Sequence, residues 1–194
     1  MVRPREFDRD IALQKAMEVF WAKGFAATST DDLLQAMRIG RQSLYNAFGD
    51  KRQLYLEALQ TYQQDVTSGH LHRLNSLPSP LEGIESLLVG LIAEDDRQRA
   101  MGCMGVGSVG EFGTTDEDLI ALRAKVSQVL QARLVERIRE GQARGEIERD
   151  MSPEQAAGFV QMTMTGLQVA ARGGADAEQL WALARFAVDR LRAR

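Results

Sequence analysis

The sequence of 194 residues is poor in residues that bind metals or form cross-links. It has one cysteine, Cys103, and two histidines, His70 and His72. A single cysteine excludes a disulfide within the chain and a metal site built from several thiolates of one chain. Two histidines at i and i+2 do not share a helix face, so they do not predict a zinc site. We therefore expect no metal and no cofactor, and we place both histidines on the surface.

Long hydrophobic runs are also missing. No apolar run approaches the roughly 20 residues that a helix needs to cross a bilayer. The N-terminus, MVRPREFDRD, is charged and has no apolar segment behind it. The hydrophobic fraction of 44% and the charged fraction of 26% are ordinary for a soluble globular protein. These features predict a cytoplasmic protein without a membrane partner.

Strand patterns are the third absence. No stretch sustains the alternation of apolar and polar residues that marks a β-strand, whereas apolar residues recur at helical spacing along most of the chain. Ser79 and Ser152, each followed by Pro, mark two helix starts. The sequence predicts an all-α fold of about nine helices. The last two, about 153–172 and 177–192, are joined by a short glycine-rich connection and form a helical hairpin.

One stretch, residues 29–51, has the pattern of two short helices joined by a tight turn. Ser29 caps the first helix, since Asp32 stands at the capping-box position. The second helix, about 41–48, directs Leu44 and Phe48 inward and leaves polar donors outside. The second helix of a helix-turn-helix uses such donors to reach phosphates and base edges in a major groove. The outward side chains are those of Arg41, Gln42, Ser43, Tyr45 and Asn46.

The charge is distributed unevenly along the chain. The net charge of −3 argues against a uniformly basic nucleic-acid binder. Residues 1–52 nevertheless hold nine Lys and Arg against seven acids, whereas residues 53–194 hold 15 against 20. The small positive excess therefore lies in the part that carries the predicted helix-turn-helix.

The pattern Phe20, Gly24-Phe25, Thr28-Ser29, Ile39, Ser43-Leu44-Tyr45, Phe48 and Lys51 resembles the DNA-binding domain of the TetR family of bacterial transcriptional regulators. The resemblance is dense over roughly the first sixty residues and covers the rest only as architecture. It implies an N-terminal three-helix domain with a helix-turn-helix, residues 1–52. A helical effector-binding and dimerisation domain, residues 53–194, would follow it.

One departure from the family lies in the predicted turn. The chain has Arg38 where family members usually carry Gly, and Gly40 where they usually carry Ser, Thr or Asn. A Gly at the first position serves a left-handed turn, and a polar residue at the second caps the recognition helix. We therefore expect the turn to be the least regular part of the motif.

The resemblance implies a sequence-specific, homodimeric repressor that binds a pseudo-palindromic operator in double-stranded DNA and is released by an unknown small-molecule effector. The residues expected to contact DNA are Arg5, Thr28, Ser29, Arg41, Gln42, Ser43, Tyr45, Asn46 and Lys51. The expected dimer interface, on the last two helices, comprises Val160, Leu167, Trp181, Phe186 and Val188. Burial of the same helices inside a monomer is the alternative.

The expected effector pocket is largely apolar and rich in methionine, although core packing explains the same residues equally well. It comprises Leu88, Ile92, Met101, Cys103, Met104, Phe112, Phe159, Met162 and Met164.

Two further interpretations stay open. Cys103 is either a small buried apolar residue or a sensor of oxidants or electrophiles, and a sensing thiol needs a nearby cation such as Arg97 or Arg99. The glycines of residues 105–110 form a GxGxxG pattern, but no strand precedes it, so it does not predict a nucleotide site. No set of convergent catalytic residues is present, which predicts that the protein is not an enzyme. A helical-bundle enzyme or a scaffold is the alternative of a different class.

Overall fold

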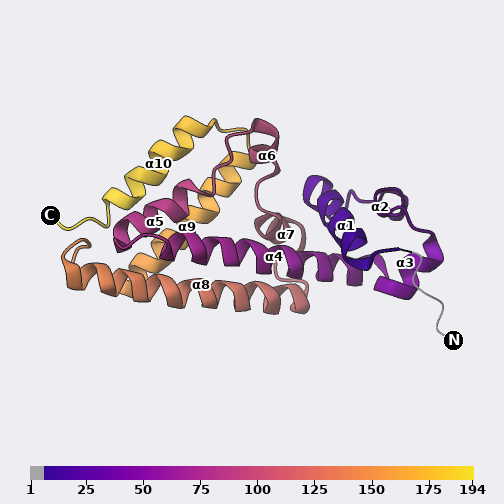
Figure 1. Cartoon of the computed structure of the whole chain (residues 1–194), viewed down its shortest axis with the longest axis horizontal. Helices are drawn as coiled ribbons and strands as arrows, with labels where there is room; N and C mark the ends of the chain where they lie inside the picture. The colour runs from indigo at the N-terminus through magenta and orange to yellow at the C-terminus, as the bar shows by residue number, and fades with distance from the viewer. Residues whose placement is uncertain (1–6) are drawn as a thin grey trace.

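The computed structural model describes residues 7–194, and Arg5, which is expected to contact DNA, lies outside the described residues. Residues 7–194 fold into ten α-helices without a β-strand (Figure 1). The all-α prediction is confirmed. The count exceeds the expected nine by one, since the segment before Gly113 forms two short helices.

The helices fall into three groups along the chain. The first three are α1 (Arg9–Lys23), α2 (Thr30–Met37) and α3 (Arg41–Phe48), which we call the reading head. The long α4 (Lys51–Asn75) follows them. The remaining helices are α5 (Pro80–Val89), α6 (Asp96–Met101), α7 (Met104–Phe112), α8 (Glu117–Arg144), α9 (Pro153–Arg172) and α10 (Ala177–Asp189).

Side-chain caps fix where several of these helices begin. Ser29 and Asp32 form both hydrogen bonds of a capping box at α2. Ser79 and Ser152 cap α5 and α9 as the sequence predicts, each with Pro in the first turn. The last helix ends at Asp189, before the expected residue 192, because the following backbone pairs with the backbone of residues 146 and 148.

Buried apolar side chains form two cores, one toward each end of α4. The first core joins the reading head to α4 as far as Tyr62 and also takes Met104 from α7 and Leu119 from α8. The second core lies among α4, α5, α8, α9 and α10. The expected domain boundary after residue 52 falls inside α4, and it stays a prediction.

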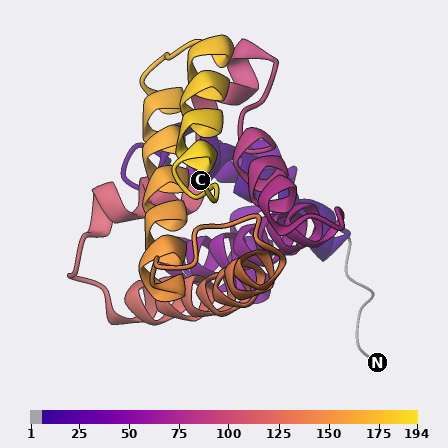
Figure 2. The same cartoon turned by 90° about the vertical axis from the view of Figure 1, so that its left-hand side faces the viewer.

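The arrangement of the helices separates two ends of the molecule. The reading head lies at one end, α8 runs alongside α4, and α5, α9 and α10 surround the other end (Figure 1). The hairpin of α9 and α10 is confirmed, and the two helices lie against each other on the outside (Figure 2). Within residues 7–194 no helix is both long enough and apolar enough to span a bilayer.

Candidate functional site

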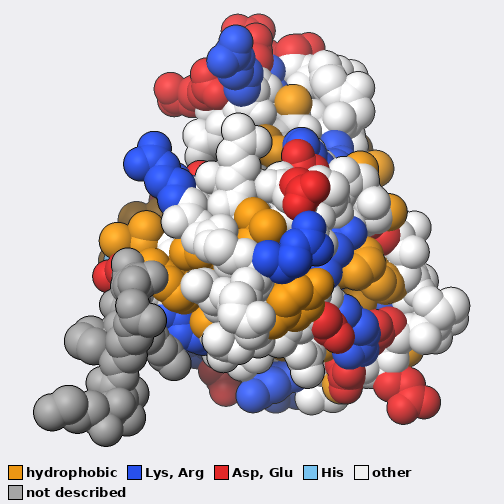
Figure 3. Space-filling model, turned by 90° about the vertical axis from the view of Figure 1, so that its right-hand side faces the viewer, with side chains coloured by type: hydrophobic (Ala, Val, Ile, Leu, Met, Phe, Trp, Pro, Cys, Tyr) orange, Lys and Arg blue, Asp and Glu red, His pale blue; other side chains and the backbone are white. Residues whose placement is uncertain are grey.

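Helix α3 presents its polar side to solvent at the far end of the molecule. Leu44 and Phe48 are buried in the first core, as the sequence predicts. The exposed side chains are those of Arg41, Gln42, Tyr45 and Asn46, while Ser43 is half-buried. Lys and Arg side chains lie among acidic and apolar ones on this end (Figure 3). The surface therefore combines cations with hydrogen-bond donors on one protruding helix.

The turn between α2 and α3 carries the exchange seen in the sequence. Arg38 adopts the left-handed conformation, with φ 54° and ψ 41°, and is the one non-glycine residue of the described chain with positive φ. Gly40 has an ordinary extended conformation, with φ −76°, and gives α3 no side-chain cap. The turn thus places a strained Arg where Gly fits best, and it leaves uncapped a helix start where Ser would bond.

The exposed donors of α3 are paired within the protein. Arg41 Nη2 lies 2.8 Å from a carboxylate oxygen of Asp31, and both side chains are exposed. Gln42 Nε2 donates to Asn46 Oδ1 at 3.0 Å. Exposed pairs of this kind contribute little to stability. A phosphate or a base edge can therefore replace these partners at small cost.

Three other residues expected to contact DNA lie beside α3. The Lys51 ammonium stands 4.2 Å from the centre of the Phe25 ring. The Ser29 hydroxyl is occupied by the capping box with Asp32. Thr28 is 1% exposed, and its hydroxyl donates to the Gly24 carbonyl at 2.6 Å. Thr28 is therefore reassigned from a DNA contact to a residue that holds the loop before α2.

Arg9 fixes the position of α3, and the sequence gave no indication of this role. Its guanidinium pairs with both carboxylate oxygens of Glu57 on α4, at 2.6 and 2.8 Å. It also donates to the Ala47 carbonyl at the end of α3 and stacks over the Phe48 ring. The hydrogen bonds to Glu57 raise the pKa of Arg9. One cation therefore ties α1, α3 and α4 together.

The α6–α7 segment is bonded to the reading head at two points. Trp21 Nε1 donates to the Gly102 carbonyl at 3.0 Å. The Glu111 carboxylate accepts from the backbone N–H groups of Phe25 and Ala26, at 3.1 and 2.9 Å. Gly24, with φ 81°, suits this contact because a Cβ there would collide with that carboxylate. A movement of α6 or α7 is thus transmitted directly to the reading head.

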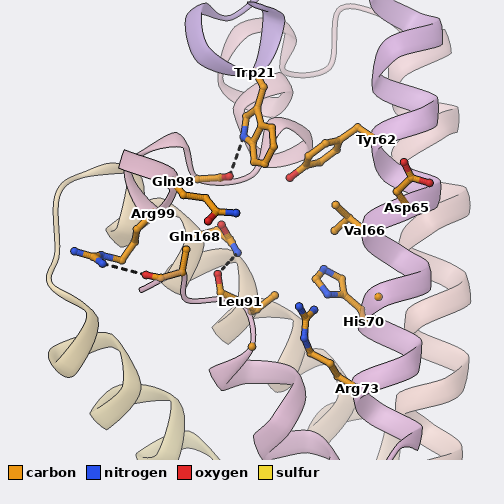
Figure 4. Close-up of a pocket in the computed structure, with 14 residues that line it drawn as sticks. Trp21, Tyr62, Asp65, Val66, His70, Arg73, Leu91, Gln98, Arg99 and Gln168 are labelled. Atoms are coloured by element: carbon orange, nitrogen blue, oxygen red, sulfur yellow. Dashed lines mark hydrogen bonds between the residues drawn. The ribbon is translucent and has the colours of Figure 1, made fainter. Parts of the chain in front are cut away.

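A cavity of about 470 Å³ lies between the reading head and the C-terminal helices (Figure 4). Its walls come from α1, α4, the end of α5, α6 and α9. Many of its side chains are polar or charged, including those of Asp65, His70, Arg73, Gln98 and Gln168. The expectation of a largely apolar, Met-rich pocket is therefore wrong for this cavity.

None of the residues expected to form the effector pocket lines this cavity. The physical reason is that most of these apolar side chains fill the two cores instead. Leu88, Ile92 and Met164 belong to the second core, Met104 is buried in the first with Cys103 and Phe112 packed against it, Met101 is half-buried on α6, and Phe159 and Met162 are exposed on α9.

His70 corrects a second expectation, since it is not a surface residue. It faces the cavity (Figure 4), and its Nδ1 is buried without a hydrogen-bond partner among residues 7–194. Burial, together with the positive charge of Arg73, lowers the pKa of His70 to about 4. The imidazole is therefore neutral at pH 7. The spacing of His70 and Arg73, one turn apart on α4, was the signal available in the sequence.

The expected dimer residues lie on two different sides of the hairpin. Val160, Leu167 and Val188 are at most 4% exposed and belong to the second core, so they are corrected to monomer core residues. Trp181 is half-buried, and Phe186 is 58% exposed. The exposed large apolar residues of the two helices form what we call the apolar face: Phe159, Met162 and Val169 on α9, and Leu183 and Phe186 on α10.

Cys103 sits at the start of α7, half-buried beside Tyr62. Arg99, considered as a cation for this thiol, donates instead to the carbonyls of Ala93, Glu94 and Ala175. No group of three or more His, Cys, Asp or Glu side chains in residues 7–194 is placed to hold a metal ion.

Two family models match the chain. Residues 12–58 match the model described as bacterial regulatory proteins of the tetR family, and residues 84–192 match the tetracyclin repressor-like C-terminal domain. The second match alone spans more than half of the chain. This chain belongs to the TetR family. The helix-turn-helix described above is therefore the DNA-binding motif of a TetR-family regulator.

Individual TetR-family relatives extend the likeness over nearly the whole chain. The transcriptional regulator YezE of Bacillus subtilis is 30% identical over 182 residues, which is 93% of this chain and 94% of YezE. The transcriptional repressor ComR of Escherichia coli is 30% identical over 187 residues, 94% of this chain and 88% of ComR. A cysteine mutant of the regulator CifR, solved with a 26-base-pair operator, is 33% identical with a TM-score of 0.79 and covers 96% and 98% of the two chains. The protein is a DNA-binding transcriptional regulator and not an enzyme.

Proposed function

We propose that this TetR-family regulator is a homodimeric repressor, which binds a pseudo-palindromic operator through two copies of α3 and is released by a small molecule. The observation that carries the proposal is the protruding α3, with its exposed donors held in place by Arg9. The operator complex of CifR and the repressor activity in the name of ComR support it for relatives at about 30% identity.

The DNA contacts follow from the exposure of the α3 side chains. Arg41, Gln42 and Tyr45 stand on the solvent side of α3, and we place them near base edges. Asn46 and the half-buried Ser43 and Lys51 are placed on phosphates, where they set the register of the helix.

The dimer contact is assigned to the apolar face. Phe159, Met162 and Val169 recur at spacings that share one side of α9, and Leu183 and Phe186 continue that side onto α10. Contiguous exposed apolar side chains mark interaction surfaces. A two-fold contact between two such faces would also give two reading heads for the two half-sites of an operator.

Release is assigned to the cavity, because it touches both parts of the molecule. Trp21 belongs to the reading head, whereas Gln98 and Gln168 belong to C-terminal helices. A ligand that binds better to the geometry unsuited to the operator would shift the population away from DNA. Its coupling free energy is expected to be about 1–3 kcal/mol.

DNA binding is tested by footprinting the region upstream of the protein's own gene. Tyr45→Ala and Lys51→Ala should each weaken binding by about tenfold, since each removes one contact worth about 1–3 kcal/mol. Lys51→Ala should also lower the dependence of log affinity on log salt by about one. Gln60→Ala, at an exposed position of α4, is the control. A wild-type protein without an operator, or two variants that bind unchanged, would contradict the assignment.

Dimer formation is tested separately by sedimentation. Met162→Glu places a charge at the most exposed apolar residue of the apolar face, 79% exposed, and should yield monomers at micromolar concentration. Ile11→Glu changes an exposed apolar residue of the reading head and should leave the dimer intact. The interface is elsewhere if the two variants have the same mass.

A further inference from the structure

Arg73 is a cation of the cavity whose guanidinium has no partner. Among residues 7–194 it makes neither an ion pair nor a side-chain hydrogen bond, although it is only partly exposed. Arg99, the other arginine of the cavity wall, pairs with Asp96 in addition to its three carbonyl acceptors. Figure 4 shows the Arg73 guanidinium beside His70, whereas the Arg99 guanidinium points away from the middle of the cavity. The charge of Arg73 is thus available to a ligand.

Two glycines provide the space in which the Arg73 side chain lies. A Cβ at Gly90, after α5, would collide with Nε and Cδ of Arg73. A Cβ at Gly69, one turn earlier on α4, would stand 3.7 Å from its Nη1. Both glycines line the cavity. The guanidinium is therefore held against the cavity wall and not extended into solvent.

The neighbours of Arg73 make one end of the cavity polar. The neutral His70 carries a buried Nδ1 without a partner among the described residues. Gln168 Nε2 donates to the Leu91 carbonyl at 3.3 Å, which leaves its side-chain oxygen as an acceptor and directs the amide into this region (Figure 4). A ligand group at this end meets a full positive charge and an imidazole.

The opposite end of the cavity is aromatic. The rings of Trp21 and Tyr62 meet edge to face with centroids 5.1 Å apart, and Val66 lies between them and His70 (Figure 4). Burial and the neighbouring Cys103 raise the pKa of Tyr62, so its hydroxyl stays protonated. This end suits an apolar or aromatic group, with one hydroxyl for orientation.

Asp65 is the acid on the cavity wall, and its position favours one orientation of a ligand. It is exposed, and it stands eight residues before Arg73 on α4, which separates the two by about 12 Å along the helix. A negative group near Asp65 would be repelled, and one near Arg73 would be attracted. The charges of α4 therefore direct an anionic group toward Arg73.

We propose that this cavity binds a small organic acid, with its carboxylate on Arg73 and its apolar body against Trp21 and Tyr62. The planar fork of a guanidinium matches a carboxylate in geometry as well as charge. A volume of about 470 Å³ fits a small molecule. The regulatory meaning of this site rests on the proposed function, whereas the binding itself does not require DNA.

The test measures binding of four acids, benzoate, phenylacetate, 3-phenylpropionate and hexanoate, each against its own primary amide. The chain has two tryptophans, so Trp181→Phe leaves Trp21 as the fluorescent reporter in the cavity. At least one acid should bind, shift the Trp21 emission, and bind about tenfold more tightly than its amide. Arg73→Gln should remove that tenfold preference, and Arg73→Lys should restore part of it. Arg97→Gln, at an exposed position of α6, should bind as the parent does.

The proposal is overturned if no acid binds at concentrations up to about 10 mM, or if acid and amide bind equally. Unchanged affinity in a folded Arg73→Gln variant also overturns it, with folding checked by thermal unfolding. Should that variant fail to fold, the acid–amide comparison on the parent protein decides.

Operator binding without any acid is measured in parallel. A failure there contradicts the proposed function and leaves the anion site standing. Binding of an acid without release of the operator contradicts the assignment of this cavity to release.

Discussion

The reading head and the cavity hold their polar groups in opposite ways. On α3, Arg41 is paired with Asp31 and Gln42 with Asn46, and all four side chains are exposed. In the cavity, Arg73 lacks a partner and the Nδ1 of His70 is buried. Exposed pairs exchange readily with phosphates and water, whereas a half-buried group without a partner gains more from a ligand. A large DNA surface and a small-molecule site therefore call for different preparation of their donors.

The largest expected effect that sharpens this contrast is a dependence of stability on pH that comes from the cavity. The pKa of His70 is lowered to about 4, so the unfolded chain takes up a proton near its ordinary value of about 6.5 while the folded chain does not. Stability is then complete above about pH 6.5 and falls as the pH drops toward 4. The loss is at most about 3 kcal/mol.

The measurement is the free energy of unfolding between these pH values. His70→Asn should flatten the dependence, and His72→Asn, at an exposed position of the same helix, should not. Equal slopes in the two variants would show that His70 is not the group responsible.

An intermediate effect is expected in the turn of the reading head. Arg38→Gly removes the cost of a left-handed non-glycine residue, about 1 kcal/mol. Gly40→Ser supplies the missing cap of α3 and adds a few tenths of a kcal/mol, since a Cβ there meets nothing within 4 Å. The double variant should raise the midpoint of thermal unfolding. An unchanged midpoint would mean that the turn carries no strain.

The smallest expected effect tests whether the pairs on α3 exchange as easily as proposed. Asp31→Asn removes the acid that pairs with Arg41 and should raise operator affinity by a few fold at low salt, less at high salt. Glu117→Gln, an exposed acid at the start of α8, is the matched control for net charge. A loss of operator affinity in Asp31→Asn would show that the pair orients Arg41 for binding.

Local signals explain what the sequence predicted well. The capping box of Ser29 and Asp32, and the caps at Ser79 and Ser152, each depend on residues three apart, and all of them form. The inward and outward sides of α3 follow from a clear helical period.

Contacts between distant segments explain what the sequence could not predict. Helix α9 is apolar nearly all round, so its period did not tell whether Val160 or Phe159 faces the core. Arg9 reaches partners 38 and 48 residues away, and nothing in its neighbourhood marks it. Arg73 has the same local pattern as any arginine near the end of a helix, and only the fold places it with Trp21 and Gln168.

The makeup of the first core also limits how the reading head can be exchanged. Its buried side chains come from three separate parts of the chain, because Met104 and Leu119 complete a core that otherwise ends at Tyr62. A chimera that joins residues 7–52 to another regulator would leave that core without its α4 wall. A functional transplant must carry α4 as far as Tyr62 and match the residues at positions 104 and 119, so operator specificity in this protein is not a detachable cassette.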